Sequence, residues 1–312
     1  MLSIISALIP TFLVIVLGVV LRRVLLKKPD HWVALEQLTY FVLFPALLIV
    51  SAVKADLSGV SVLAVVGAMF GAILIMSAVL LVLRRPIADA TGIDGPAFTS
   101  LFQGVTRWNT YVALAVCGGL YGAAGVTVAA VALVAMIPAV NVICVIVLAR
   151  YVGAHAPTPR FILGQLLRNP FIWSCLAGAL LNGFAVPVPK VVVEFGDILG
   201  RASLALGLLV VGGGLALDRL NRLKPVVILA VVLKLFAKPA VAILLGLAFG
   251  LSGTELAVLA IVCAVPSAPN GYVLARQMGG DAPLLAEMLT FQIIVAAASL
   301  PLVLSALKMV VP

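Results

Sequence analysis

Long apolar runs alternate with short polar breaks along the whole chain. A helix needs about twenty apolar residues to cross a bilayer. The breaks fall at turn and charge clusters such as Lys27-Lys28-Pro29-Asp30 and Arg84-Arg85-Pro86. The pattern predicts an all-α membrane protein with ten transmembrane helices. They cover residues 2–22, 34–53, 60–83, 97–119, 124–149, 165–184, 196–217, 226–250, 254–275 and 284–308.

The composition favours the same class. Of the 312 residues, 64% are hydrophobic and 10% charged, and the mean hydropathy is +1.30. A soluble domain has about 25% charged residues, so this chain has too few to cover its apolar surface in water. Length alone suggests about two soluble domains. In lipid it predicts a single helical bundle instead.

The net charge of +9 lies in short loops rather than on one polar face, which argues against nucleic-acid binding. With the N-terminus outside, thirteen lysines and arginines fall in cytoplasmic loops and four on the external side. The first apolar run has no basic residue before it and no cleavage site after it, so it is a retained helix. Both termini are therefore expected to be external.

One polar phrase occurs twice. Asn109-Thr110-Tyr111-Val112 is followed by Gly118-Gly119, and Asn270-Gly271-Tyr272-Val273 is followed at the same spacing by Gly279-Gly280. Both copies lie inside apolar runs. A repeated polar phrase at membrane depth points to a transport site.

The repeat divides the chain into two halves of five spans each, residues 1–150 and 161–312. Pro10 and Gly18 in the first span also match Pro170 and Gly178 in the sixth. Because five is odd, the second half must be inverted relative to the first. Inverted repeats are typical of secondary transporters. The alternative is a duplication kept only for packing.

The ninth span contains helix-breaking residues. Pro266, Pro269 and Gly271 lie close together, and each proline lacks an N–H and clashes with the carbonyl one turn back. We expect an interrupted helix whose freed backbone groups face protein or a wet cavity; a proline kink is the alternative. The fourth span has Gly104 and a polar run at 106–110 but no proline, so its interruption rests on the repeat.

If both spans are interrupted, their N-terminal N–H groups and positive dipole ends are available to an anion. Asn109, Thr110, Ser267 and Asn270 are expected to line the gap. The two asparagines could instead form interhelical hydrogen bonds, worth about 0.6–2 kcal/mol each. We favour a site role because the repeat pairs them beside helix breakers.

Three cations lie within the spans, Arg107, Lys234 and Lys238, whereas no acid lies well inside any span. This imbalance argues for an anionic substrate and against an antiporter built on buried aspartates. Arg107 serves either as a counter-charge for a carboxylate or, if its span begins later, reaches towards the cytoplasm. Asn141 and Gln292 either extend the polar wall of the site or make structural hydrogen bonds. No metal cluster, cofactor motif or nucleophile–base pair is visible, so no enzyme is predicted.

Several segments, in order across the ten spans, resemble the auxin efflux carrier family, which includes plant PIN-type exporters and bacterial permeases for malonate. The segments are Asn109–Val112, Val265–Asn270, Val273–Arg276 and Gly279–Asp281, together with Asn169-Pro170 and Lys238-Pro239. The chain departs from plant members at Leu114 and Val116, where they have glycine and proline, and at Gly271, where they have the crossover proline. Auxin specificity and the shape of the fourth-span break therefore do not carry over. The loop 150–161 is short, so regulation through a long cytoplasmic loop is not expected.

The resemblance implies an elevator fold like that of bile-acid symporters. A dimerising scaffold would hold spans 1, 2, 6 and 7 (about 2–53 and 165–217), and a transport domain spans 3–5 and 8–10 (about 60–149 and 226–308). The predicted helix breaks are at Gly104, Val116, Pro266, Pro269 and Gly271. The predicted substrate site comprises Arg107, Asn109, Thr110, Tyr111, Asn141, Lys238, Ser267, Pro269, Asn270, Gly271, Tyr272 and Gln292.

The leading hypothesis is a secondary transporter in a bacterial inner membrane that moves a small organic anion, a mono- or dicarboxylate such as malonate or an auxin-like acid. Lys238 and Arg107 would supply positive potential, and proton or sodium coupling stays open. One alternative is a sodium-coupled carrier of the bile-acid type. The other is an anion channel or a sensor that does not transport.

Overall fold

A computed structural model describes residues 2–54, 60–152, 170–219 and 223–310, and within these residues every regular element is a helix. This confirms the predicted all-helical class. Asn169, most of the loop 150–161 and the start of the predicted sixth span lie outside the described residues. The elements are α1 Leu2–Val24, α2 Pro29–Leu38, η1 Thr39–Leu43, α3 Phe44–Val53, α4 Val62–Val82, α5 Arg84–Thr91, α6 Gly95–Thr106, α7 Thr110–Val152, α9 Pro170–Gly183, α10 Lys190–Gly213, η2 Leu217–Arg219, α11 Pro225–Val232, η3 Leu233–Ala237, α12 Lys238–Ala248, α13 Gly253–Ala264, α14 Asn270–Met278 and α15 Ala282–Val310.

Six helical stretches among the described residues are long and apolar enough to cross a membrane. They are Pro29–Val53, Val62–Val82, Gly95–Leu133, Lys190–Gly213, Pro225–Ala248 and Ala282–Leu307. Apolar side chains such as Leu13 and Leu17 of α1 are exposed, whereas Arg107 and Lys238 are buried. This distribution suits a protein whose surroundings are lipid.

The long helix α7 changes direction at Gly122, whose φ of +59° is not helical. Glycine adopts this φ without the steric cost that a side chain would bring. The change of direction lies between the predicted fourth and fifth spans, so α7 contains the second part of one and all of the next.

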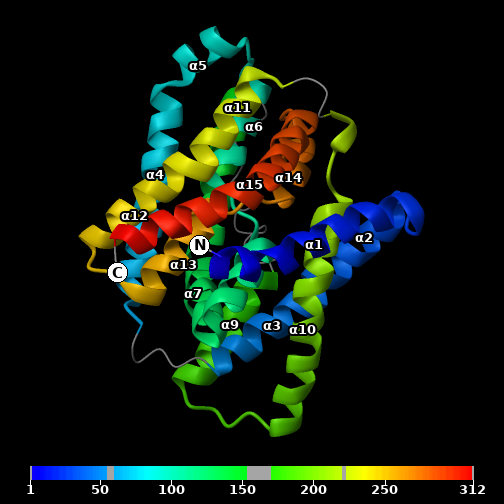
Figure 1. The fold of residues 1–312 in the computed structure, drawn as a ribbon, viewed down its shortest axis with the longest axis vertical. Helices are drawn as coiled ribbons and strands as arrows, with labels where there is room; N and C mark the ends of the chain where they lie inside the picture. The colour runs from blue at the N-terminus through cyan, green and yellow to red at the C-terminus, as the bar shows by residue number, and fades with distance from the viewer. Residues whose placement is uncertain (1, 55–59, 153–169, 220–222, 311–312) are drawn as a thin grey trace.

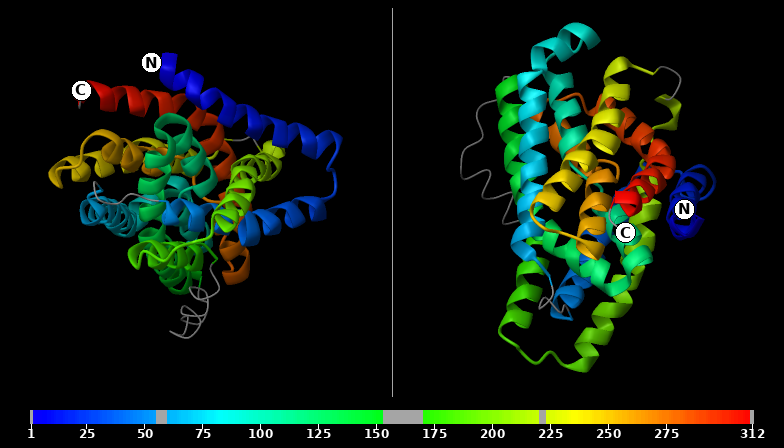
Figure 2. Two further views of the ribbon diagram at one scale, coloured as in Figure 1. Left: turned by 90° about the horizontal axis from the view of Figure 1, so that it is seen from below. Right: turned by 60° about the vertical axis from the view of Figure 1, so that its left-hand side comes forward.

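The helices pack in two groups (Figure 1). In the first, α1 packs against α10, and α3 packs against both α9 and α10. In the second, α12 contacts both α4 and α13, while α7 contacts α6 and α13. The N-terminal end of α1 and the C-terminal end of α15 lie on the same side of the molecule in both views of Figure 2.

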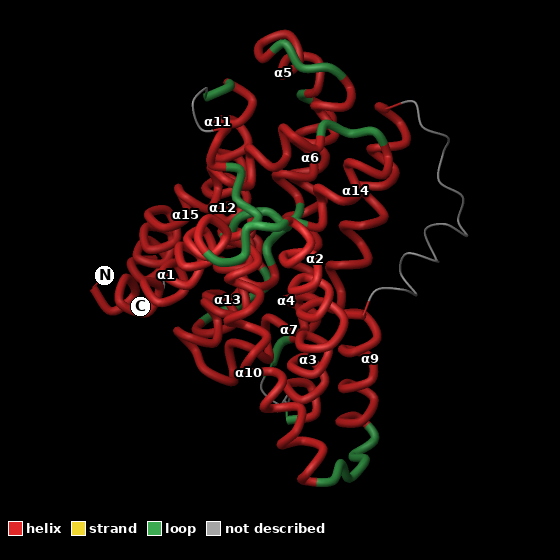
Figure 3. Tube along the Cα trace, turned by 90° about the vertical axis from the view of Figure 1, so that its right-hand side faces the viewer, coloured by secondary structure: helices red, strands yellow, loops and turns green. Residues whose placement is uncertain are grey.

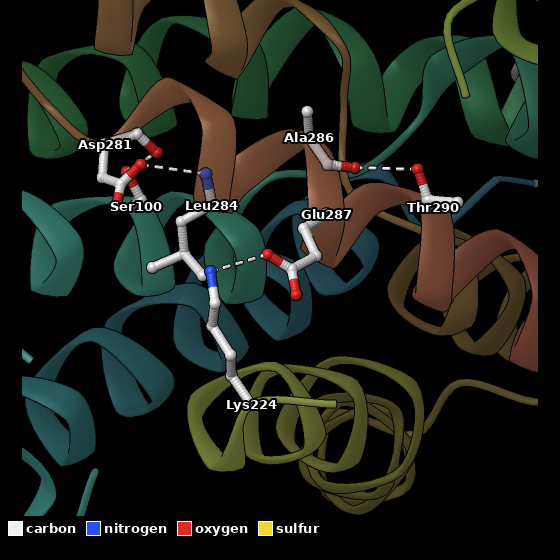
Figure 4. A network of polar contacts seen from close by, with 7 residues as sticks. All are labelled: Ser100, Lys224, Asp281, Leu284, Ala286, Glu287 and Thr290. Atoms are coloured by element: carbon white, nitrogen blue, oxygen red, sulfur yellow. Dashed lines mark hydrogen bonds and ion pairs between the residues drawn. The ribbon is translucent and has the colours of Figure 1, made fainter. Parts of the chain in front are cut away.

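Polar contacts fix the start of α15 (Figure 4). The Asp281 carboxylate accepts a hydrogen bond from Leu284 N at 2.9 Å, which satisfies a free N–H of the first turn. The Asp281 carbonyl accepts another from Ser100 Oγ of α6 at 2.8 Å. Glu287 pairs with Lys224 at 2.9 Å, just before α11. These contacts hold the first turns of α15 against α6 and against the start of α11.

Candidate functional site

Two helices are interrupted inside the protein, and their interruptions touch. The helix α6 ends at Thr106 and α7 begins at Thr110, while α13 ends at Ala264 and α14 begins at Asn270. The connecting loops run through the interior in Figure 3. Asn109 N donates a hydrogen bond to Pro266 O at 2.7 Å. The two loops therefore cross in direct contact.

The interruption of the fourth span lies at residues 107–109, so the predicted break positions Gly104 and Val116 are wrong. Both lie within regular helix, in α6 and α7. Asn109 explains the difference because its Oδ1 accepts from Tyr111 N at 3.1 Å and Val112 N at 3.2 Å. A polar cap thus starts α7 without glycine or proline.

In the ninth span, Pro266 and Pro269 lie in the loop between α13 and α14, and Gly271 lies in the first turn of α14. A Cβ on Gly271 would lie 3.1 Å from Arg107 Cδ. Gly271 therefore allows the arginine side chain to pass close to the backbone.

A small cavity of about 30 Å³ lies at the starts of α7 and α14. It is lined by Arg107, Trp108, Thr110, Ile137, Val140, Asn141, Ala268 and Asn270. Thr110 and Asn270 are the first residues of their helices, so two positive dipole ends converge on it. The cavity therefore favours negative charge.

Arg107 is the charged group of this cavity and is only 4% exposed. Its Nε donates to Gln103 Oε1 at 3.1 Å, and its Nη1 donates to Asn141 Oδ1 at 2.9 Å and to Asn270 Oδ1 at 3.4 Å. All three acceptors are neutral amides, and no carboxylate among the described residues pairs with Arg107. The positive charge of the guanidinium is therefore not balanced by a paired carboxylate in the described part of the chain.

Three further donors near the crossing are buried without an acceptor among the described residues. They are Gln103 Nε2, Trp108 Nε1 and Asn109 Nδ2. Each such group costs about 1–3 kcal/mol relative to a paired one. The crossing therefore has an excess of hydrogen-bond donors together with a positive charge, which suits a carboxylate.

Ser267 and Gln292 do not line this cavity and instead join helices. Ser267 Oγ donates to Gln103 O at 3.0 Å, and Ser267 N donates to Gln292 Oε1 at 2.9 Å. Gln292 Nε2 donates to Gly104 O at 3.0 Å. Together they hold the second loop and α15 against α6.

Four other predicted site residues also lie away from the small cavity. Lys238 donates to Thr106 O at 2.5 Å. The ring of Tyr111 stacks on Phe44 of α3 at a centroid distance of 4.5 Å, in the other group of helices. Tyr272 lines a second cavity, as does Pro269.

The second cavity has a volume of about 690 Å³ and is lined by residues of α1, α2 and α10 and by residues of α14 and α15. Its lining includes the bases Arg22, Arg23 and Lys27 and the acids Glu36 and Asp218. Pockets for small organic molecules measure about 300–1,000 Å³. The cavity reaches the second loop through Pro269 and is large enough to admit such a molecule.

Gln103, Trp108 and Lys234 contribute to the crossing but were not predicted as site residues. Gln103 lies one turn before Arg107, a spacing that brings side chains together on a helix. That spacing is the signal that could have identified it. Neither Gln103 nor Trp108 belongs to the repeated phrase.

The family model described as "Membrane transport protein" matches residues 3–304. The chain belongs to this family. The match confirms the resemblance to auxin efflux carriers and establishes that this family member is an integral membrane transporter. A comparison of this membrane transport protein with curated proteins gives no match.

Proposed function

We propose that this transporter is a secondary carrier of a small organic anion, a mono- or dicarboxylate of which malonate is the test case. The observation that carries the proposal is the buried Arg107, whose hydrogen-bond partners among the described residues are all amides and which lies where two helix N-termini converge. A carboxylate would satisfy both the guanidinium and the unpaired donors beside it.

The direct contacts that we propose are Arg107, Thr110, Asn141 and Asn270, which line the small cavity. Asn109 would contribute through its free Nδ2. A cavity of about 30 Å³ holds about two water molecules, so a dicarboxylate requires it to widen. Substrate binding would therefore be linked to movement of the interrupted helices.

We also propose ten spans arranged as two inverted repeats. Gly18 on α1 leaves no room for a side chain against Leu209 of α10, and Gly178 on α9 leaves none against Ile49 of α3. These two glycines match in the sequence repeat, and their helix contacts also correspond. The paired interruptions in α6–α7 and α13–α14 support the same relation.

An elevator motion fits the two helix groups. The group containing α1, α3, α9 and α10 would be the scaffold and form the homodimer, while the other group carries Arg107. The cavity of about 690 Å³ between them would give access from the cytoplasm, given its three basic residues. We place the protein in a bacterial inner membrane with both termini external, which the shared side of the two chain ends supports.

Counterflow in proteoliposomes tests the function. Vesicles loaded with unlabelled malonate should accumulate labelled malonate transiently, because a carrier exchanges substrate across the membrane. Phosphate loading serves as the control anion and should not drive accumulation. A channel would pass malonate without stimulation by the internal pool, and a sensor would bind it without flux. Either result would contradict the proposal.

A further inference from the structure

Trp108 lies in the loop that joins α6 to α7, between Arg107 and Asn109. Its side chain is only 5% exposed and lines the small cavity. Its Nε1 is buried and has no hydrogen-bond acceptor among the described residues. An indole N–H can donate but cannot accept, so the donors that surround Trp108 do not satisfy it. It needs an acceptor.

The amide oxygens that share the cavity with Trp108 already have donors. Asn141 Oδ1 and Asn270 Oδ1 both accept from Arg107 Nη1, at 2.9 Å and 3.4 Å. Because each amide turns its oxygen towards the guanidinium, its NH₂ group adds further donors to the site. The apolar side chains of the cavity lining supply no acceptor, and they are Ile137, Val140 and Ala268.

Lys238 contacts the indole without using its N–H. The Nζ atom of Lys238 lies 5.4 Å from the centre of the Trp108 ring, a distance at which a cation is attracted to the π electrons of an indole face. The same Nζ donates to the carbonyl of Thr106 at 2.5 Å. An ammonium group accepts no hydrogen bond, so this contact leaves Nε1 without a partner.

A buried donor without a partner can discriminate between ligands. A site that offers a hydrogen bond to its substrate rejects an analogue lacking the matching acceptor, because the buried donor then stays unpaired. Arg107 and the positive starts of α7 and α14 attract the carboxylate of any small acid. They do not distinguish one such acid from another, whereas the N–H of Trp108 does.

We propose, resting on the carrier function above, that Trp108 is a specificity-determining residue whose Nε1 donates to a second acceptor on the substrate, besides the carboxylate at Arg107. Both side chains line one cavity of about 30 Å³, so one small molecule reaches both. The site then selects acids with a further oxygen acceptor, such as 2-oxo acids and dicarboxylates, over simple acids of the same length.

The test compares pyruvate with propionate, two acids of equal length and charge that differ by the 2-oxo oxygen. Titration calorimetry on purified protein measures both affinities for wild type and for Trp108→Phe, which keeps an aromatic ring and removes the N–H. Trp173→Phe is the matched control, because that tryptophan is 55% exposed on α9. Thermal unfolding establishes that each variant is folded.

We expect wild type to bind pyruvate about 5- to 150-fold more tightly than propionate, because propionate leaves Nε1 unpaired. Trp108→Phe should reduce this ratio to about 3-fold or less, mainly through weaker binding of pyruvate. Trp173→Phe should keep the wild-type ratio. A tryptophan that only packs against its neighbours would change both affinities together and leave the ratio unchanged.

Two results would overturn the role of Trp108 and leave the carrier function intact. Wild type would bind the two acids with equal affinity, a result that needs no variant. Trp108→Phe would keep the wild-type ratio, which would assign the discrimination to another donor. If wild type binds neither these acids nor malonate, the carrier function fails, and the proposal fails with it.

Discussion

The starts and the ends of the interrupted helices differ in which protein groups bond to them. At the starts of α7 and α14, Arg107 donates to neutral amides, and three nearby N–H donors have no acceptor among the residues that the structure describes. At the ends of α6 and α13, Lys238 and Lys234 each bond a backbone carbonyl. At the helix ends, the backbone carbonyls thus have lysine partners from the protein. At the helix starts, the side-chain donors exceed the acceptors. We propose that the ligand binds at the donor-rich side, while the lysine bonds stabilise the other side.

The largest expected effect is that of Arg107→Met on malonate affinity. Hydrogen bonds to a charged group contribute about 1.5–3 kcal/mol, so its loss should weaken binding about 10- to 100-fold. Titration calorimetry on purified protein measures this. Arg107→Lys keeps the positive charge but lacks the planar guanidinium, so its malonate affinity should lie between those of wild type and Arg107→Met. Equal affinity of Arg107→Met and wild type would mean that the arginine only supports the fold.

Gln292→Ala should act on stability instead of affinity. It removes the acceptor of Ser267 N and the donor to Gly104 O, both buried. We expect a loss of about 1–3 kcal/mol, seen as a lower unfolding temperature, with malonate affinity of the folded protein unchanged. Gln277→Ala, on the exposed side of α14, is the matched control. A loss of affinity without a loss of stability would place Gln292 in the binding site.

Asn141→Ala and Asn270→Ala should give smaller effects that rank by distance from Arg107. Asn141 Oδ1 lies 2.9 Å from Nη1 and Asn270 Oδ1 lies 3.4 Å from it. Each asparagine orients the guanidinium but carries no charge itself, so affinity should fall only about 2- to 10-fold, with Asn141→Ala the weaker binder. The reverse order would show that Asn270 contacts the substrate more closely than Asn141 does.

Much of the fold follows from the sequence because apolar length and helix breakers act locally. Pro266 and Pro269 lie in the interruption of the ninth span, as the sequence predicted. The fourth-span break was misplaced because a capping asparagine, rather than glycine or proline, starts α7. The number of spans and the inverted halves stay predictions, since six stretches of the described residues meet the criteria for a span.

The site was harder to predict. The sequence shows that a charged residue lies in a span, but it does not show whether its side chain reaches the end of one interrupted helix or the start of the next. Lys238 was assigned to the substrate, yet its amine bonds Thr106 O. Gln103 was overlooked although it lies one turn before Arg107, and only the tertiary structure brings Ser267 to it. Tertiary partners of this kind are not encoded in local pattern.

Calorimetry of malonate binding to Arg107→Met and Lys238→Met, measured side by side in NaCl, decides where the anion binds. The two candidates are the starts of α7 and α14, near Arg107, and the end of α6, near Lys238. The structure predicts that Lys238→Met binds with an affinity close to that of wild type, because its amine lies outside the cavity. Arg107→Met should bind at least about 10-fold more weakly. Loss of binding in Lys238→Met with retention in Arg107→Met would contradict the assignment of the anion site to the starts of α7 and α14.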